Sequence, residues 1–199
     1  MTSRTRAPRQ ARVRHLLLGA LCAGLTLSTG GSISGTPSGT GTASFTVMVT
    51  DSATPTAGTA TKALTIDIFA PVVITTAATL PEGTTGSAYS TTLAATGGEV
   101  PLAWSLDSGS LPPGLTIGSS TGTISGTPTL AGSYAFTAKA TDSGSPARIG
   151  TKAMTIDVFD AMVITTASTP DGTLSVAYST TITATGGDGS YTWSVSAGT

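Results

Sequence analysis

The sequence predicts an all-β chain made of tandem two-sheet sandwich repeats of about 90 residues each. Three observations predict this fold class: long stretches recur at a fixed offset, apolar residues alternate with a period of two, and turn-forming residues interrupt the chain at short intervals. Thr, Val and Ile favour the pleated, half-buried surface of a strand, whereas Gly, Ser, Pro and Asp favour turns. Because no long apolar run has helical spacing, we expect strands and no helices in the repeats.

The repeat is visible when the chain is compared with itself. Residues 62–69 return as residues 152–159 at an offset of 90, and residues 88–98 return as residues 177–187 at an offset of 89. Offsets that differ by one residue indicate a single kind of module whose loops gain or lose single residues.

The phase of the repeat divides the chain into one complete module and two partial ones. Residues 71–159 are a complete copy, residues 24–69 correspond to the C-terminal half of a copy, and residues 161–199 correspond to the N-terminal half. The two open halves sum to roughly one module, so head-to-tail self-association of chains is one expectation. The alternative is that the halves belong to a longer array and are partly disordered or prone to aggregation when cut from it.

Alternation within residues 71–159 predicts about seven short strands. Successive side chains point to opposite faces of a strand, so the apolar positions mark the buried face. Trp104 lies on the third strand, where sandwiches of this kind hold a core tryptophan, and Tyr134 with Phe136 resembles a tyrosine corner in which packing replaces a disulfide. The aromatic side chains expected in the core are Tyr89, Trp104, Tyr134 and Phe136, and in the partial copy Tyr178, Tyr191 and Trp193.

The first 23 residues have the composition of a secretory signal peptide. Five of the nine basic residues lie in the first 14 positions and precede the apolar run of residues 16–23, which is the order that signal peptides show. The run is too short to span a bilayer as a helix, and Cys22 makes lipid attachment a further option. The alternative is a miscalled start, because residues 24–27 already belong to the repeat. The signal peptide predicts an extracellular or cell-surface protein.

Charge and rare residue types exclude several classes of function. The chain beyond the first 23 residues carries four basic and ten acidic side chains, so it lacks the basic surface that nucleic-acid binding requires. Cys22 is the single cysteine and His15 the single histidine, which leaves the repeats without the side chains of zinc sites or of Ser-His-Asp and Cys-His centres. We therefore expect that the protein is not an enzyme.

Several motifs occur in a fixed order within the complete copy: residues 109–117, 120–128, 131–137 and 140–142. Together they are similar to the bacterial putative Ig-like repeat family, which belongs to the cadherin-like, immunoglobulin-like β-sandwich superfamily. The resemblance covers residues 24–199. It implies an extracellular sandwich repeated in tandem in large surface or secreted proteins, and it carries over no catalytic residue.

The same resemblance directs attention to calcium, because cadherin-like modules often bind this ion at domain junctions. Calcium takes six to eight oxygen ligands, supplied largely by carboxylates. The weak candidates at the second junction are Asp157, Asp160 and Asp171, with Asp142 expected nearby, whereas the first junction offers Asp67 and Glu82. The alternative is that these carboxylates are ordinary solvent-facing residues, and no other cofactor is expected.

The composition and the resemblance lead to two functional hypotheses. The first is a non-catalytic spacer or stalk module, because tandem modules with few charges and Thr-rich faces suit a rod that projects another part of a protein. The second is an adhesion module that binds an extracellular protein or glycan through its loops or an exposed sheet edge. The sequence identifies no ligand for it.

Overall fold

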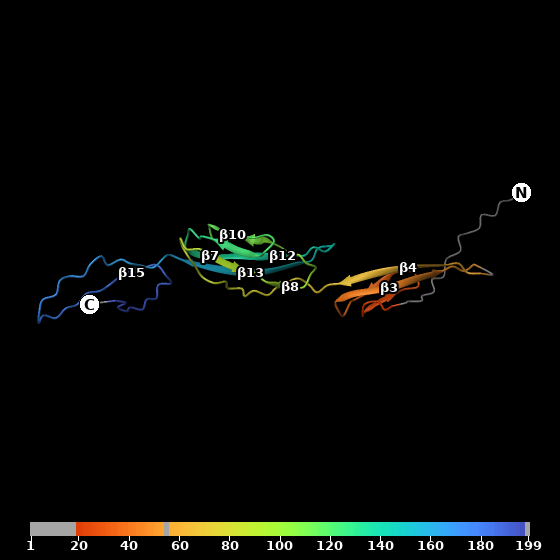
Figure 1. Cartoon of the computed structure of the whole chain (residues 1–199), viewed down its shortest axis with the longest axis horizontal. Coiled ribbons are helices and arrows are strands. Elements are labelled where there is room, and N and C mark those ends of the chain that lie inside the picture. Colours follow the sequence, from red (N-terminus) through yellow and green to blue (C-terminus); the bar gives the residue numbers. More distant parts are fainter. Residues whose placement is uncertain (1–18, 54–55, 198–199) are drawn as a thin grey trace. The chain divides into compact units, whose positions relative to one another are not determined.

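The computed structural model describes residues 19–53 and 56–197, and every regular element in these ranges is a strand (Figure 1). Contacts divide the chain into two compact units, residues 1–70 and residues 71–199. Among the described residues, no helix is long and apolar enough to cross a membrane. The predicted signal peptide lies outside the described residues except for its last positions.

The first unit consists of two antiparallel ribbons. One joins β1 and β2 with Leu25 opposite Gly35, and the other joins β3 and β4 over ten residue pairs. Phe45 on β3 is 3% exposed and is the one buried apolar side chain among residues 19–53 and 56–70. The strands are β1 (Leu25–Leu27), β2 (Ile33–Gly35), β3 (Gly41–Thr50) and β4 (Thr59–Ile68).

The complete copy in the second unit is a sandwich of two main sheets. One sheet has the order β10-β11-β7 and the other the order β6-β13-β12-β9, while β5 pairs with β8. Strand β6 runs parallel to β13, and the remaining pairs are antiparallel. The strands are β5 (Val73–Ile74), β6 (Gly83–Thr84), β7 (Tyr89–Thr92), β8 (Ala95–Thr96), β9 (Ala103–Gly109), β10 (Leu115–Ile117), β11 (Thr123–Gly126), β12 (Gly132–Thr141) and β13 (Ile149–Phe159).

The predicted strand at residues 89–95 is divided in the structure. Its first part, β7, pairs with β11, whereas its continuation, β8, pairs with β5. The chain therefore changes ladder partner between Thr92 and Ala95, which period-two alternation does not reveal because the apolar side chains keep the same phase. The short parallel strand β6 also lacks a sequence signal, since it consists of Gly83 and Thr84.

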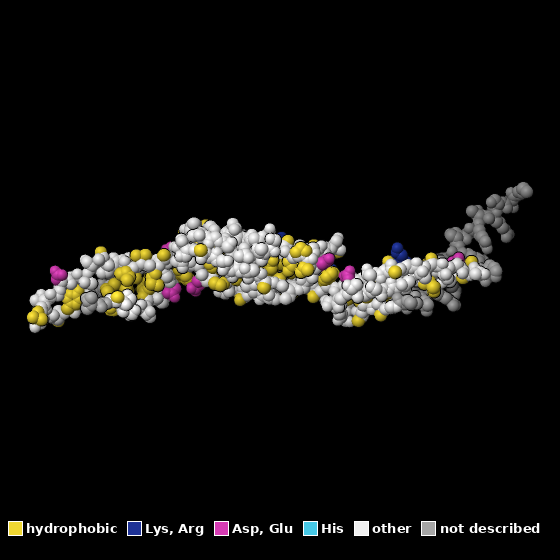
Figure 2. All heavy atoms as spheres, in the orientation of Figure 1, with side chains coloured by type: hydrophobic (Ala, Val, Ile, Leu, Met, Phe, Trp, Pro, Cys, Tyr) yellow, Lys and Arg dark blue, Asp and Glu magenta, His cyan; other side chains and the backbone are white. Residues whose placement is uncertain are grey.

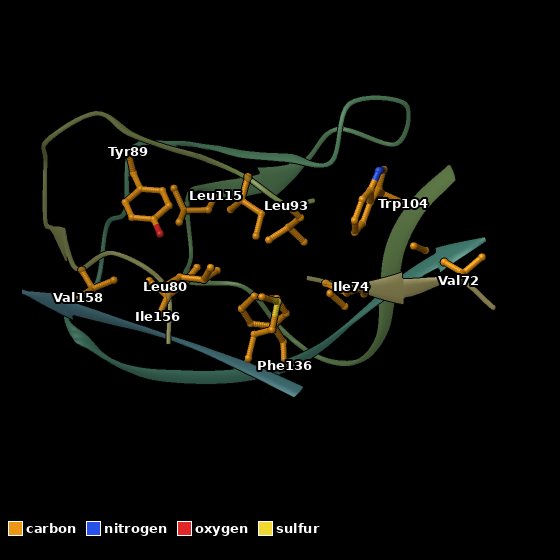
Figure 3. Packing of buried hydrophobic residues seen from close by; sticks show 14 residues of the cluster. Val72, Ile74, Leu80, Tyr89, Leu93, Trp104, Leu115, Phe136, Ile156 and Val158 are labelled. Atoms are coloured by element: carbon orange, nitrogen blue, oxygen red, sulfur yellow. The ribbon is translucent and has the colours of Figure 1, made fainter. Parts of the chain in front are cut away.

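The core of the complete copy lies between its two sheets, as Figure 3 shows. Ile156 is fully buried and Met154 and Val158 are each 2% exposed, so the predicted alternation on the last strand is confirmed. From the opposite sheet, Ile124 is fully buried. Two sheets that each contribute one apolar face form the two-layer architecture that the sequence predicted.

Residues 161–197 contain one short ladder. Strand β14 (Val163–Ile164) pairs antiparallel with β15 (Ala184–Thr185), in the same way that β5 pairs with β8 in the complete copy. The segment reproduces a further detail of that copy, because the hydroxyl of Tyr178 donates a hydrogen bond to the carbonyl of Pro170 at 2.9 Å, as Tyr89 does to Pro81 at 3.0 Å.

Candidate functional site

The junction that follows β13 forms a hollow within the second unit. Its volume is about 750 Å³, and it lies between the end of β13, the start of β12 and residues 184–191. Asp157 and Asp160 both line it. The carboxylate of Asp160 accepts a hydrogen bond from the hydroxyl of Thr85 at 3.3 Å, and its carbonyl accepts one from the N–H of Gly187 at 2.9 Å. Two of the three predicted calcium candidates therefore share one hollow.

The third calcium candidate, Asp171, does not line this hollow. Asp188 lines it instead, and its carboxylate already accepts a hydrogen bond from the N–H of Ser190 at 2.8 Å. In residues 19–53 and 56–197, no three His, Cys, Asp or Glu side chains are arranged so that they could hold a metal ion. Calcium binding at this junction stays a prediction beside the solvent-facing alternative, which the separation of the three carboxylates around the hollow favours.

The expectation that Asp142 lies near this junction is wrong. Thr141 pairs with Ile149 at one end of the β12–β13 ladder, and Gly132 pairs with Val158 at the other. At about 3.4 Å per residue, the nine residue steps between these pairs separate Asp142 from the junction by roughly 30 Å. Asp142 belongs to the opposite pole of the sandwich, where it follows the last residue of β12.

At that pole Asp142 connects two loops, the one between β8 and β9 and the one between β12 and β13. Its side chain is buried and accepts hydrogen bonds from the backbone N–H groups of Arg148 at 2.6 Å, Glu99 at 3.0 Å and Gly144 at 3.2 Å. The Arg148 guanidinium adds an ion pair at 2.7 Å. The hydrogen bond from the Arg148 backbone, followed by those from Glu99 and from the Arg148 side chain, lowers the pKa of Asp142 well below its usual value, although burial opposes the shift.

Sequence reasoning missed this role of Asp142, although the sequence contains a signal for it. The run Thr-Asp-Ser occurs at residues 141–143 and again at residues 50–52. In the first unit the carboxylate of Asp51 accepts hydrogen bonds from the N–H groups of Ala53 at 3.0 Å and Gly58 at 2.7 Å. A carboxylate that repeats at the same turn and caps backbone donors is a structural brace. Its oxygens already accept backbone hydrogen bonds, which is not the arrangement of a carboxylate that binds a ligand.

The predicted aromatic core is confirmed in the complete copy. Tyr89 and Trp104 are 7% exposed and Phe136 is 3% exposed. Tyr134 is half-buried against the core, and its hydroxyl donates to the carbonyl of Leu130 at 3.1 Å. This hydrogen bond to a carbonyl four residues upstream is the one that a tyrosine corner makes.

The corresponding prediction for residues 161–199 is wrong for two aromatic side chains. Trp193 is 50% exposed and Tyr178 is 51% exposed. In the complete copy, these positions are covered by the second half of the module, which residues 161–197 do not contain. Figure 2 shows hydrophobic side chains at the surface of this segment. The exposed large apolar residues are Met162, Val163, Ile164, Leu174, Val176, Tyr178, Ile182, Trp193 and Val195.

The first unit has an apolar hollow of its own, with a volume of about 280 Å³. It lies between the β1–β2 ribbon and the β3–β4 ribbon. Val49 and Leu64, which are 43% and 39% exposed, form part of its wall. The apolar or small residues that line it include Leu27, Gly31, Ile33, Val47, Val49 and Leu64.

Comparisons with solved structures return low overall similarity. A protein described as a "putative alpha-galactosidase" from Bacteroides fragilis is 26% identical, with 44% of this chain and 17% of that chain covered and a TM-score of 0.38. The protocadherin gammaB4 extracellular domain is 15% identical, with coverage of 77% and 29% and a TM-score of 0.41. Mouse cadherin-23 EC22-24 is 17% identical, with coverage of 69% and 50% and a TM-score of 0.37. The chain thus spans half or less of each of these structures, and no curated protein matches it.

Comparison with family models gives a clear assignment. The family described as "Putative Ig domain" matches twice, over residues 17–68 and residues 70–159. The two matches together cover more than half of the chain, and they meet at the boundary between the two units. The observed sandwich, its tyrosine corner and its tandem organisation agree with this match. The chain belongs to the Putative Ig domain family, with an immunoglobulin-like β-sandwich as its repeated module.

Proposed function

We propose that this chain is a non-catalytic spacer or stalk segment of a secreted or cell-surface repeat protein. The observation that carries the proposal is the short connection between successive repeats: residues 69–72 lie between β4 and β5, and residues 160–162 lie between β13 and β14. Connections of three or four residues leave no room for a long flexible linker between modules. Repeats joined in this way are suited to extending a chain by a fixed length.

The composition of the surface supports the same function. Ion pairs among the described residues are few, with Lys139 to Asp107 at 3.5 Å on the surface and Arg148 to Asp142 at the brace. The sheet exteriors carry Thr and Ser pairs, such as the Thr92 and Thr123 hydroxyls at 3.0 Å. A surface of short hydroxyl side chains that pair with one another offers few groups for a specific ligand.

The test is to lengthen the chain by whole modules. One, two or three extra copies of residues 71–159 are inserted in phase after Phe159, and the maximum dimension is measured by small-angle X-ray scattering. An 11-residue strand such as β13 is about 36 Å long, so a spacer should gain about 35–45 Å per copy. A gain that falls well short of one strand length per copy would show that the modules fold back on one another, and the spacer would be wrong.

An adhesive role is the second candidate, and the hollow at the β13 junction favours it. Its wall combines three carboxylates, those of Asp157, Asp160 and Asp188, with Tyr191 and several glycines, a mixture that can contact a polar ligand such as a glycan. Glycan-array binding that is lost in Asp160→Asn, and retained in Asp107→Asn, a residue that does not line the hollow, would support adhesion. If the wild-type chain binds no glycan and no surface protein, the spacer function remains the better description.

A further inference from the structure

We propose that the chain after β13 forms a stiff joint at Asp160, which hydrogen bonds hold to the complete copy on one side and to the following repeat on the other. The proposal deepens the spacer function and rests on it for the purpose of the joint. Every contact that carries it lies within residues 71–199, which form one compact unit.

The complete copy holds the joint through the segment that follows β6. The N–H of Thr85 donates to the carbonyl of Phe159 at 2.9 Å, and the hydroxyl of Thr85 donates to the carboxylate of Asp160 at 3.3 Å. The next residue is anchored in turn, because the N–H of Gly86 donates to the carbonyl of the buried Pro128 at 2.9 Å. The support that β13 receives from its own sheet therefore extends past the end of the strand.

The following repeat holds the same residue by its backbone. The N–H of Gly187 donates to the carbonyl of Asp160 at 2.9 Å. Gly187 lies two residues past β15, so this hydrogen bond extends the β14–β15 ladder toward the complete copy. Backbone hydrogen bonds thus run from the last sheet of one repeat to the first ladder of the next, and Asp160 is the residue at which they change partner.

The absence of a side chain at Gly186 lets the turn after β15 lie directly on the joint. A Cβ at this position would lie 2.2 Å from the carbonyl oxygen of Ala161 and 2.9 Å from that of Asp160, distances at which atoms clash. The φ of Gly186 is +83°, in the left-handed region that glycine adopts readily. The hydroxyl of Tyr191 donates to the carbonyl of Gly186 at 2.7 Å and restrains the turn further.

The paired glycines of the repeat pack against the chain that enters each module. In the complete copy, a Cβ at Gly98 would lie 2.6 Å from the side chain of Val72. Gly187 and Met162 are the corresponding residues of the following repeat, where the equivalent separation is 3.4 Å. The contact between the glycine turn and the entering chain is therefore a feature of the repeat itself.

The carboxylate distinguishes this junction from the preceding one. Ala70 occupies the position in the repeat that corresponds to Asp160, and alanine has no side-chain acceptor. Residues 161–199 belong to the same compact unit as the complete copy, whereas the boundary between the two units falls directly after Ala70. We expect a stiff joint where an acidic residue occupies this position.

The test measures the distance across the joint by electron–electron double resonance on the full chain, in a Cys22→Ser background. Spin labels are attached at Thr151→Cys in the complete copy and at Thr181→Cys in the following repeat, two exposed positions. A stiff joint should give a single narrow distribution of distances. A broad distribution in this otherwise unchanged chain would overturn the proposal.

Two glycine variants separate the contact at the joint from the cost of the backbone conformation. Gly186 and Gly189 have φ values of +83° and +87°, so alanine meets a similar backbone cost at both, but a Cβ at Gly189 would have no neighbour within 4 Å. Gly186→Ala should broaden the distance distribution and speed up exchange of the Gly187 amide about fivefold or more, as loss of one net hydrogen bond does. Gly189→Ala should change neither. Labels at Ser168→Cys and Thr181→Cys, both in the following repeat, should keep their distance in all variants, and equal broadening by the two glycine variants would contradict the joint.

Variants of Asp160 test the side chain and leave the glycine turn intact. Asp160→Ala removes the acceptor of the Thr85 hydroxyl and should broaden the distribution, whereas Asp160→Asn keeps an oxygen acceptor and should retain the narrow one. Thr85→Val removes the donor, so it should add nothing to Asp160→Ala when the two are combined. If Asp160→Ala stays as narrow as the wild type, the carboxylate takes no part and the proposal is wrong. Lengthening by whole modules can fail while this joint is stiff, so failure of the spacer function and failure of the joint give different results.

Discussion

The sharpest prediction compares the same substitution at two equivalent positions. Trp104 and Trp193 occupy the same place in successive repeats, yet Trp104 is 7% exposed and Trp193 is 50% exposed. A buried tryptophan removes about 150–250 Å² from water, which at about 25 cal/mol per Å² is worth about 4–6 kcal/mol. Mutational costs of Trp→Ala in protein cores, about 3–5 kcal/mol, agree with that figure. Trp104→Ala should therefore destabilise the complete copy by about 4 kcal/mol.

The assay is thermal unfolding followed by circular dichroism on the full chain at low concentration. A domain of 60–100 residues loses about 4–8 °C per kcal/mol, so Trp104→Ala should lower the transition of the complete copy by about 15 °C or more. Trp193→Ala should leave that transition within the roughly 0.5 kcal/mol typical of surface changes. Equal shifts in the two variants would refute the reasoning, because they would mean that the burial of Trp104 contributes nothing specific.

Three further predictions concern the brace, the glycines and calcium. The pKa of Asp142 is lowered in the folded state, so the ionised side chain stabilises the fold above the unfolded pKa of about 3.9. This stability is lost as the pH falls toward the folded pKa. The difference in melting temperature between the wild type and Asp142→Asn should therefore narrow below about pH 4. Gly122→Ala should lower the melting temperature of the complete copy sharply through its clash with the core indole, whereas Gly31→Ala should carry only the backbone cost of about 1–2 kcal/mol. Millimolar calcium should leave the melting temperature unchanged; a rise of several degrees that disappears in Asp157→Asn and Asp160→Asn would contradict this.

The fold was largely predictable because its signals are local and repeated. Alternation placed Ile156 and Val158 in the core, and the structure buries both. The tyrosine corner was predictable because it depends on Tyr134 and a carbonyl only four residues away. The whole pattern repeats at an offset near 90 residues. Because modules with the same strands form the same sheets, this repeat predicted a tandem array of one kind of sandwich.

The candidate site was less predictable because it depends on contacts between residues far apart in sequence. Asp142 was expected near Asp160, but both carboxylates flank the same long hairpin at opposite ends. The local sequence around Asp142 does not indicate that the backbone N–H of Glu99, 43 residues away, donates a hydrogen bond to its carboxylate. The placement follows from the pairing of β12 with β13, and strand pairing is the part of a β fold that a single sequence specifies least directly.

The misassigned aromatic residues show what a repeat sequence determines. Trp193 aligns with Trp104 in the repeat but lies outside the strands of the structure. The residues beside Trp104 in the complete copy, Gly122 and Ala140, belong to the second half of the module. The core of this sandwich is therefore an interface between two half-modules, each with an apolar face that is stable only when covered.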